Sequence, residues 1–202
     1  VASSPCDNAN FQMIDTHAHV FHRGLRFAPQ RRYTPDYDAW PATYLRLLDQ
    51  YHVQAGVLVP VSILGNDNSF VVETVQTSGG RLKGMVTLDP ALGAAQVRAF
   101  ETQGMCGFRL NLAGQPLPGL QTGAWPEILR ECARYDWIAE VNDRANRLSQ
   151  TLPMLLDEGL RVVVDHFGQP DKLLGPVDPG FQYLLGLGNT QRVWVKLSAP
   201  YR

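Results

Sequence analysis

Short apolar segments alternate with segments of helical periodicity along almost the whole chain. The apolar segments are rich in Val, Ile and Leu, and they lie at 11–20, 55–62, 82–89, 106–112, 136–143, 160–168 and 192–198. Apolar residues recur at helical spacing between them, at 39–51, 67–80, 94–104, 125–135, 147–159 and 181–189. Near-continuously apolar strands that alternate with helices are typical of a parallel sheet covered by helices.

Two architectures fit this alternation: a doubly wound open sheet and a (β/α) barrel. The chain has no P-loop, and no G-x-G-x-x-G follows its first apolar segment, which disfavours the nucleotide-binding open sheets. Polar residues instead end several predicted strands, as a barrel active site requires. We therefore predict an α/β fold, a (β/α)8 TIM barrel of metal-hydrolase type with about seven strands in this chain. The predicted division is an N-terminal tail at 1–10 and a single incomplete barrel domain at 11–202.

Composition excludes several classes of function. The chain has 202 residues, a formal net charge of -1 and no basic stripe of the kind that binds nucleic acid. No apolar run approaches the roughly 20 residues that span a membrane, and the first residues do not read as a secretory signal. The cysteines Cys6, Cys106 and Cys132 are too irregularly spaced for a disulfide framework or a metal knuckle. We expect a cytoplasmic protein that binds neither nucleic acid nor membrane and that can form a homo-oligomer.

The segment DTHAHVF places an aspartate and two histidines at the end of the first predicted strand. Because successive side chains of a strand point to opposite faces, Asp15, His17 and His19 are expected to share one face. If that face lines the barrel lumen, two imidazoles stand together at its C-terminal mouth. Imidazole suits metal ligation and hydrogen-bond donation near neutral pH. H-x-H alone is equally compatible with two partly exposed histidines that share no role.

A second segment, VDHFG at 164–168, ends another Val-rich strand with Asp165 and His166 before a glycine turn. Three of the five histidines in the chain therefore end predicted strands. Asp165 is expected to orient His166 or to pair with a neighbouring cation. The alternative is a buried aspartate that caps the following segment beside a solvated histidine.

The segment GFRLNL at 107–112 adds a positive charge to the same predicted face. Its apolar residues alternate with Arg109 and Asn111, so both polar side chains point to one side of the strand. An arginine inside a barrel needs a carboxylate or an anionic ligand as its partner, and its planar head suits carboxylates. We favour substrate binding over the alternative, an internal ion pair with Glu140 or Asp15.

Taken together, the motifs of the chain resemble the amidohydrolase superfamily, most of all its branch named for 2-pyrone-4,6-dicarboxylate lactonase. The motifs are DTHAHVF, RRYTPDYDAW, VPVSILGNDNSF, GFRLNL, VDHFGQP and VWVKLSAPYR. They occur in similar order and spacing from about residue 11 to the last residue. The resemblance implies a (β/α)8 barrel and hydrolysis of a small substrate, typically a lactone that carries carboxylates.

The resemblance also implies roles for individual residues. His17 and His19 match the histidine pair of strand one and His166 matches the histidine of strand six, which polarise the substrate carbonyl and are the predicted catalytic residues. Arg109 matches a carboxylate-binding arginine of strand four. Further predicted substrate-binding residues are Ser62, Tyr33 and the polar strand end Asn142. Tyr33 belongs to the long loop 22–38, which either covers the barrel mouth or is a solvated basic loop.

The chain departs from the pattern of this family in three places. The fifth predicted strand has Glu140 and Asn142 but no histidine, so a binuclear metal site is not expected, and neither a metal nor another cofactor is predicted. Asn111 and Gln115 occupy the region of a second carboxylate-binding arginine, which puts the dicarboxylate pyrone in doubt. The catalytic aspartate of strand eight would lie beyond Arg202, so the sequence is expected to be a carboxy-terminally incomplete version of its family.

Three functions are consistent with these residues. The first is hydrolysis of a small anionic substrate, a carboxylated lactone or cyclic ester, with the carbonyl polarised by the strand-end histidines. The second is a metal-dependent amidohydrolase or decarboxylase in which His17, His19 and His166 hold Zn²⁺ or Mn²⁺. The third is a non-catalytic truncated barrel that binds a small acid or a partner chain.

Overall fold

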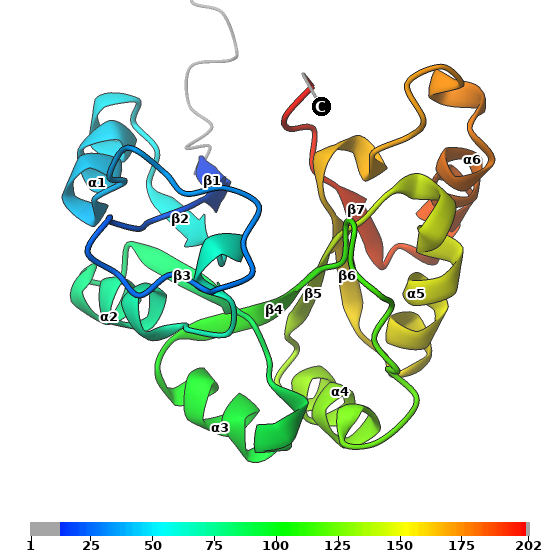
Figure 1. Cartoon of the computed structure of the whole chain (residues 1–202), viewed down its shortest axis with the longest axis horizontal. Helices are drawn as coiled ribbons and strands as arrows, with labels where there is room; N and C mark the ends of the chain where they lie inside the picture. The colour runs from blue at the N-terminus through cyan, green and yellow to red at the C-terminus, as the bar shows by residue number, and fades with distance from the viewer. Residues whose placement is uncertain (1–12, 201–202) are drawn as a thin grey trace, which may run out of the picture.

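The computed structural model describes residues 13–200, so the predicted tail 1–10 lies outside the described residues. In this part of the chain seven parallel strands form one sheet in chain order, and the sheet curls into an open half-barrel (Figure 1). The strands are β1 (Ile14–Ala18), β2 (Ala55–Leu58), β3 (Leu82–Val86), β4 (Met105–Asn111), β5 (Ile138–Asn142), β6 (Arg161–Val164) and β7 (Val193–Val195). The predicted strands and the predicted α/β barrel architecture are thus confirmed.

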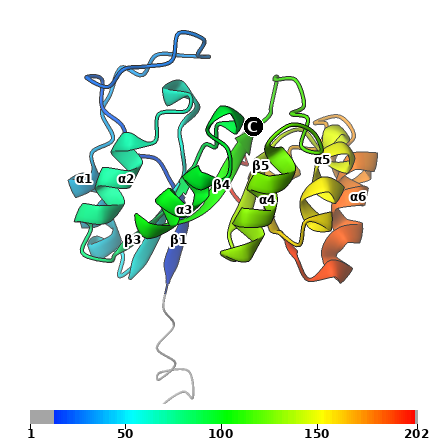
Figure 2. The same ribbon diagram turned by 90° about the horizontal axis from the view of Figure 1, so that it is seen from below.

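Six α-helices follow strands of the sheet in the described residues. They are α1 (Pro41–Gln50), α2 (Ser69–Thr77), α3 (Ala95–Thr102), α4 (Trp125–Arg134), α5 (Ala145–Asp157) and α6 (Pro179–Gly186). The helices lie around the outside of the curl, as both ribbon views show (Figures 1 and 2). The inner, concave face of the sheet is left to the strands and to the loops at their ends. None of the helices in residues 13–200 is long and apolar enough to cross a membrane.

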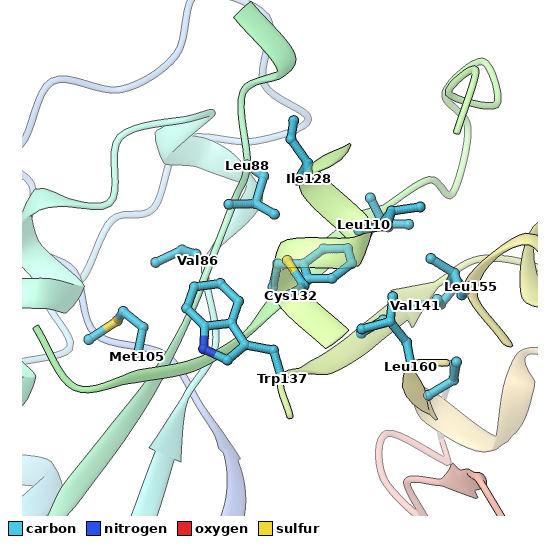
Figure 3. Packing of buried hydrophobic residues seen from close by; sticks show 14 of the residues in the cluster. Val86, Leu88, Met105, Leu110, Ile128, Cys132, Trp137, Val141, Leu155 and Leu160 are labelled. Carbon is cyan, nitrogen blue, oxygen red and sulfur yellow. The ribbon is translucent and has the colours of Figure 1, made fainter. Parts of the chain in front are cut away.

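The hydrophobic core fills the layer between the outer face of the sheet and the helices. Phe108 of β4, Ile128 of α4 and Leu148 of α5 are fully buried there, and Figure 3 shows the side chains of Trp137 and Cys132 in the same layer. Burial of one such side chain stabilises the fold by about 1.5–3 kcal/mol. Because this layer fixes the outward side of each strand, the alternate residues must face inward.

Strand register aligns the inward-facing residues across the sheet. Arg109 of β4 pairs with Glu140 of β5, and Glu140 pairs in turn with Val163 of β6. Val163 pairs with Trp194 of β7. The next side chains on the same face are two residues further along β6 and β7, so Asp165 and Lys196 stand beside Arg109 and Glu140 on the concave face.

Two predicted segments differ from the observed elements. Strand β2 ends at Leu58, well before the predicted end at residue 62, because Pro60 has no N–H to donate to the sheet. Helix α5 begins at Ala145, before the predicted start at 147, and continues through Pro153, although proline inside a helix usually kinks or breaks it. Burial of Leu148, Leu152 and Leu155 on one side of α5 outweighs the local preference of proline.

Candidate active site

The first strand contains a β-bulge that changes the face on which its side chains lie. Asp15 pairs with Gly56 and Ala18 pairs with Leu58, so β1 has one more residue than β2 between these two pairs. An extra residue shifts the alternation of side chains by one position. Asp15 and Ala18 therefore both lie on the outer face, although an uninterrupted strand would place them on opposite faces.

The prediction that Asp15 shares a face with the two histidines is consequently wrong. Asp15 points toward helix α1, where its Oδ2 accepts a hydrogen bond from the Tyr44 hydroxyl at 3.0 Å. His17 and His19 follow the bulge and lie together, with ring centroids 4.9 Å apart. The ring of His166 lies 5.2 Å from that of His17. The three predicted catalytic histidines thus come together on the concave side without Asp15.

Each of the three imidazoles is held through its Nδ1 atom. His19 Nδ1 is 2.8 Å from the carbonyl oxygen of Val59, and His166 Nδ1 is 2.9 Å from Ser198 Oγ. His17 Nδ1 lies 3.0 Å from Lys196 Nζ. Protein groups that bind one ring nitrogen fix the orientation of the ring and the position of its proton.

His166 begins a short segment with left-handed backbone. His166, Phe167, Gly168 and Gln169 have φ values of 53°, 57°, 72° and 45°. Non-glycine residues adopt this region at a cost, and such strain clusters at functional sites. The Phe167 N–H donates to the carbonyl of Lys196 at 2.9 Å, so the end of β7 holds the strained turn in place.

Arg109 is buried, and its guanidinium is bound within the protein. Its Nη2 and Nε lie 2.6 and 3.2 Å from Asp165 Oδ2, and its Nη1 donates to the Pro60 carbonyl at 3.0 Å. Nε is also 3.2 Å from Glu140 Oε1. The internal ion pair that was considered for Arg109 is therefore present, with Asp165 and Glu140 as partners. Asp15 is excluded as a partner because the bulge turns it outward.

Lys196 completes this charged cluster, and sequence reasoning missed it. Its Nζ contacts Glu140 Oε2 and lies 3.7 Å from Asp165 Oδ1, in addition to its contact with His17. The signal was available in the segment VWVKLS: Val193 and Val195 pack against the core, so Trp194 and Lys196 must face inward. Two cations and two carboxylates thus face one another beside the histidines.

The two carboxylates of the cluster titrate differently. Burial, together with the neighbouring Asp165 carboxylate, raises the pKa of Glu140 to about 7, although Lys196 and Arg109 act in the opposite direction. Burial also acts to raise the pKa of Asp165. The contact with His17 and the charges of Arg109 and Lys196 outweigh burial and hold the pKa of Asp165 below its usual value.

The histidines of β1 are neutral near pH 7. Burial lowers the pKa of His19 to about 4, although its hydrogen bond to the Val59 carbonyl acts in the opposite direction. Burial also lowers the pKa of His17, assisted by the charge of Lys196 and opposed by Asp165. A neutral imidazole has one N–H donor and one acceptor nitrogen. His17 and His19 are therefore neutral rings, and each can donate or accept one hydrogen bond at its Nε2 atom.

Asn142, a predicted substrate-binding residue, belongs to a chain of side-chain amides at the C-terminal ends of the strands. Its Nδ2 donates to Asn111 Oδ1 at 2.7 Å, and its Oδ1 accepts from Gln169 Nε2 at 2.5 Å. This chain links β4, β5 and the strained turn after β6. Its role in substrate binding stays a prediction.

Ser62 and Tyr33 lie in segments that follow strands at the same end of the sheet. Ser62 begins a short 3-10 helix two residues after Pro60, whose carbonyl accepts from Arg109. Tyr33 is about half exposed in the loop 22–38. In the same loop, the N–H of Ala28 donates a hydrogen bond to the carbonyl of Ile63 at 2.7 Å, so the loop lies against the segment after β2. Contact of either side chain with substrate stays a prediction.

The possible metal ligands among these residues, which are His17, Asp165 and His166, do not fit a tightly held divalent cation. Ligand atoms of His17, Asp165 and His166 lie within 4.8 Å of one another, as a metal site requires. However, both oxygens of Asp165 already face cations, Oδ2 at 2.6 Å from Arg109 and Oδ1 at 3.7 Å from Lys196. A divalent ion would add charge to a group of residues whose carboxylates are already neutralised.

Comparison with known proteins supports the resemblance of the motifs. A family model described as amidohydrolase matches residues 14–202. A 2-pyrone-4,6-dicarboxylate hydrolase of Comamonas testosteroni is 30% identical over 94% of this chain, and a 4-sulfomuconolactone hydrolase of Hydrogenophaga intermedia is 28% identical over 93%. The chain spans 63% of the length of each of these two relatives.

A solved structure shows the same fold. It is a probable 2-pyrone-4,6-dicarboxylic acid hydrolase from Acinetobacter baumannii with citric acid bound, and it is 36% identical with a TM-score of 0.89. The alignment covers 94% of this chain and 71% of that one. The family model covers nearly all of the described residues, and these relatives carry names from the predicted branch. The chain therefore belongs to the amidohydrolase family.

Proposed function

We propose that the protein hydrolyses a small carboxylated lactone or cyclic ester. The observation that carries this proposal is the cluster of His17, His19 and His166, buried or partly buried and each held through Nδ1, beside the buried side chains of Arg109, Glu140, Asp165 and Lys196. Neutral imidazoles with fixed orientation can polarise a carbonyl group without a metal.

The names of the relatives support the same class of substrate. Both curated relatives are named as hydrolases, one of 2-pyrone-4,6-dicarboxylate and one of 4-sulfomuconolactone. The Acinetobacter baumannii protein was solved with citric acid, a small tricarboxylate. Because the chain spans 63% of the curated relatives, the activity of the whole protein and its substrate are proposed here by likeness.

The proposed mechanism begins with binding of a substrate carboxylate by Arg109. A guanidinium has five N–H donors, and three of them make hydrogen bonds to Asp165 and Pro60 among the described residues. The remaining two, one on each terminal nitrogen, can receive the two oxygens of a carboxylate. Histidines of the cluster that donate from Nε2 then stabilise the carbonyl oxygen as water adds to the carbonyl carbon and the oxygen gains negative charge. A general base, which the resemblance to the family implies is an aspartate of an eighth strand, would take the proton from water and return it to the ring oxygen as the C–O bond of the lactone breaks.

The test is hydrolysis of 2-pyrone-4,6-dicarboxylate by the purified protein, followed by loss of the pyrone absorbance. Wild-type protein should open the lactone, and His17→Asn should lower kcat on the order of 10²–10³-fold, the usual effect of removing one oxyanion donor. His52→Asn is the matched control, because His52 is exposed and lies at the end of α1. Equal rates for wild type and His17→Asn would contradict the proposal, and so would failure of wild-type protein that includes the eighth strand to open either this pyrone or a carboxylated muconolactone.

Several predictions from composition stay as proposals beside this function. A small anionic molecule is the proposed partner, with no nucleic acid, and the cytoplasm is the proposed location. Homo-oligomer formation and the single-domain organisation of 11–202 also stay predictions.

A further inference from the structure

Lys196 links the last described strand to the first one across the concave face of the sheet. Its Nζ lies 3.0 Å from Nδ1 of His17, a residue 179 positions earlier in the chain. The Lys196 side chain is 9% exposed, and its ammonium also contacts the buried carboxylate of Glu140. A buried ammonium in this position determines which ring nitrogen of His17 carries the proton.

The constraint follows from the donors and acceptors of the two groups. A lysine ammonium has three N–H donors and no lone pair, so it can donate a hydrogen bond but not accept one. The nitrogen that faces it at 3.0 Å must therefore be an acceptor, which means that His17 Nδ1 carries no proton. In a neutral imidazole the single proton then lies on Nε2.

The opposite tautomer would require an unfavourable contact. Asp165 Oδ1 is 3.4 Å from His17 Nδ1 and Glu140 Oε1 is 3.7 Å from it, so either carboxylate could attract a proton on that nitrogen. That proton would point at the same region as the Lys196 ammonium. Lys196 is closer than both carboxylates, and Arg109 adds a second positive charge beside them.

His19 provides a contrast within the same strand. Its Nδ1 faces the carbonyl oxygen of Val59 at 2.8 Å. A carbonyl oxygen only accepts hydrogen bonds, so Nδ1 of His19 carries the proton and Nε2 is the acceptor. The two neighbouring histidines of β1 are therefore expected to present opposite groups to the concave face, an N–H from His17 and a lone pair from His19.

We propose that Lys196 is a positioning residue that fixes His17 as the tautomer with its proton on Nε2. His17 is then the hydrogen-bond donor for the carbonyl oxygen, whereas His19 can only accept, for example from the attacking water. This catalytic consequence rests on the proposed lactone hydrolysis. The tautomer itself rests on the contacts among the described residues and does not require turnover.

The first experiment measures the tautomers directly. Two-bond ¹H–¹⁵N correlation spectra of the uniformly labelled full chain at pH 7.5 distinguish protonated from unprotonated ring nitrogens, and His17→Asn and His19→Asn identify the signals. We expect the His17 proton on Nε2 and the His19 proton on Nδ1. A His17 ring with its proton on Nδ1, or a doubly protonated ring, would overturn the proposal. Failure of lactone hydrolysis would leave this result unchanged, so the two proposals can fail separately.

The second experiment changes the donor. Lys196→Met removes the ammonium, and the His17 proton should move to Nδ1, where Asp165 accepts it. Lys196→Arg keeps a side chain that only donates, so the wild-type tautomer should be retained. Lys83→Met, the same change at an exposed lysine of β3, is the control. An unchanged His17 tautomer in Lys196→Met would overturn the proposal.

The same variants connect the tautomer to turnover. Lys196→Met should lower kcat for pyrone hydrolysis on the order of 10²–10³-fold with a smaller change in KM, because the carbonyl loses a donor only as its oxygen becomes charged. Lys196→Arg should recover part of this loss. If Lys196→Met does not fold, the wild-type and Lys196→Arg spectra still decide the tautomer. A Lys196→Met enzyme with wild-type kcat would contradict the catalytic part.

Discussion

At the scale of single residues, the buried cluster combines charges that would be costly alone. Arg109, Glu140 and Asp165 are almost fully buried, and the Lys196 side chain is 9% exposed. Removal of water from any one of these ions costs several kcal/mol, and the opposite charges within 2.6–3.7 Å offset this cost. The cluster is therefore expected to tolerate loss of one member poorly, because a partner would be left buried and unpaired.

Replacement of Arg109 by methionine tests this balance. Arg109→Met leaves the Asp165 carboxylate without its 2.6 Å partner and should lower the free energy of unfolding by about 3–5 kcal/mol. Urea unfolding followed by circular dichroism is the measurement. Arg98→Met is the control, because Arg98 is exposed and its 3.5 Å contact with Glu131 is worth at most about 1 kcal/mol. Similar losses in both variants would contradict the prediction.

Glu140 should make stability depend on pH. Its pKa is about 7 in the folded protein, against an ordinary value of 4.5. Between these values the folded protein keeps a proton that the unfolded chain has lost, so this group's contribution to the free energy of unfolding falls as pH rises, by up to about 3 kcal/mol. Glu140→Gln removes this contribution. The difference in unfolding free energy between wild type and variant should therefore change by that amount between about pH 4.5 and pH 7.

His19 acts in the opposite direction over nearly the same interval. Its pKa is lowered from 6.5 to about 4, so the folded protein lacks a proton that the unfolded chain holds, and stability rises with pH in this range. The two contributions oppose each other in wild-type protein. In urea unfolding at several pH values, the free energy of unfolding of Glu140→Gln should rise with pH, and that of His19→Asn should fall with pH. Parallel profiles for the three proteins would contradict both assignments.

At the scale of the elements, the bulge of β1 depends on close packing between β2 and α1. A Cβ atom at Gly56 would lie 2.2 Å from the Tyr44 hydroxyl, which is the group that binds Asp15. Gly56→Ala should therefore lower the free energy of unfolding by about 1–3 kcal/mol, the usual cost of overpacking. Gly186→Ala is the control, since nothing lies within 4 Å of a Cβ at that position. Thermal unfolding that is equal for both variants would contradict this prediction.

The elements also show where sequence reasoning succeeds and where it stops. All seven strands were predicted, because apolar segments that are buried on one side and end in polar residues are strong local signals. The bulge was not predicted, because it arises from the way in which β1 pairs with β2, and the sequence of β1 alone contains no signal for it. For the same reason Asp15 was assigned to the wrong face. Arg109 and Asp165 were recognised as charges in need of partners, but their pairing depends on how the sheet curls.

At the scale of the whole molecule, the sheet curls without closing in the part of the chain that the structure describes. Strands β1 and β7 are its two edges, and each pairs with one neighbour only. No strand among the described residues pairs β7 with β1. Edge strands expose N–H and C=O groups that can pair with another chain. Apolar side chains at both edges, including Ile14 and Trp194, are about half exposed.

The open edges predict that this 202-residue chain associates with itself. Sedimentation velocity should show an average mass that rises with protein concentration, because β7 can add to an exposed edge of a second copy. Charged side chains protect edges, so the double variant Trp194→Lys, Leu197→Lys should shift association to higher concentration. Leu173→Lys is the control, because Leu173 is more exposed than either but lies in the loop before α6. A chain that stays monomeric at every concentration, or an equal effect of the control, would show that the edges do not drive association.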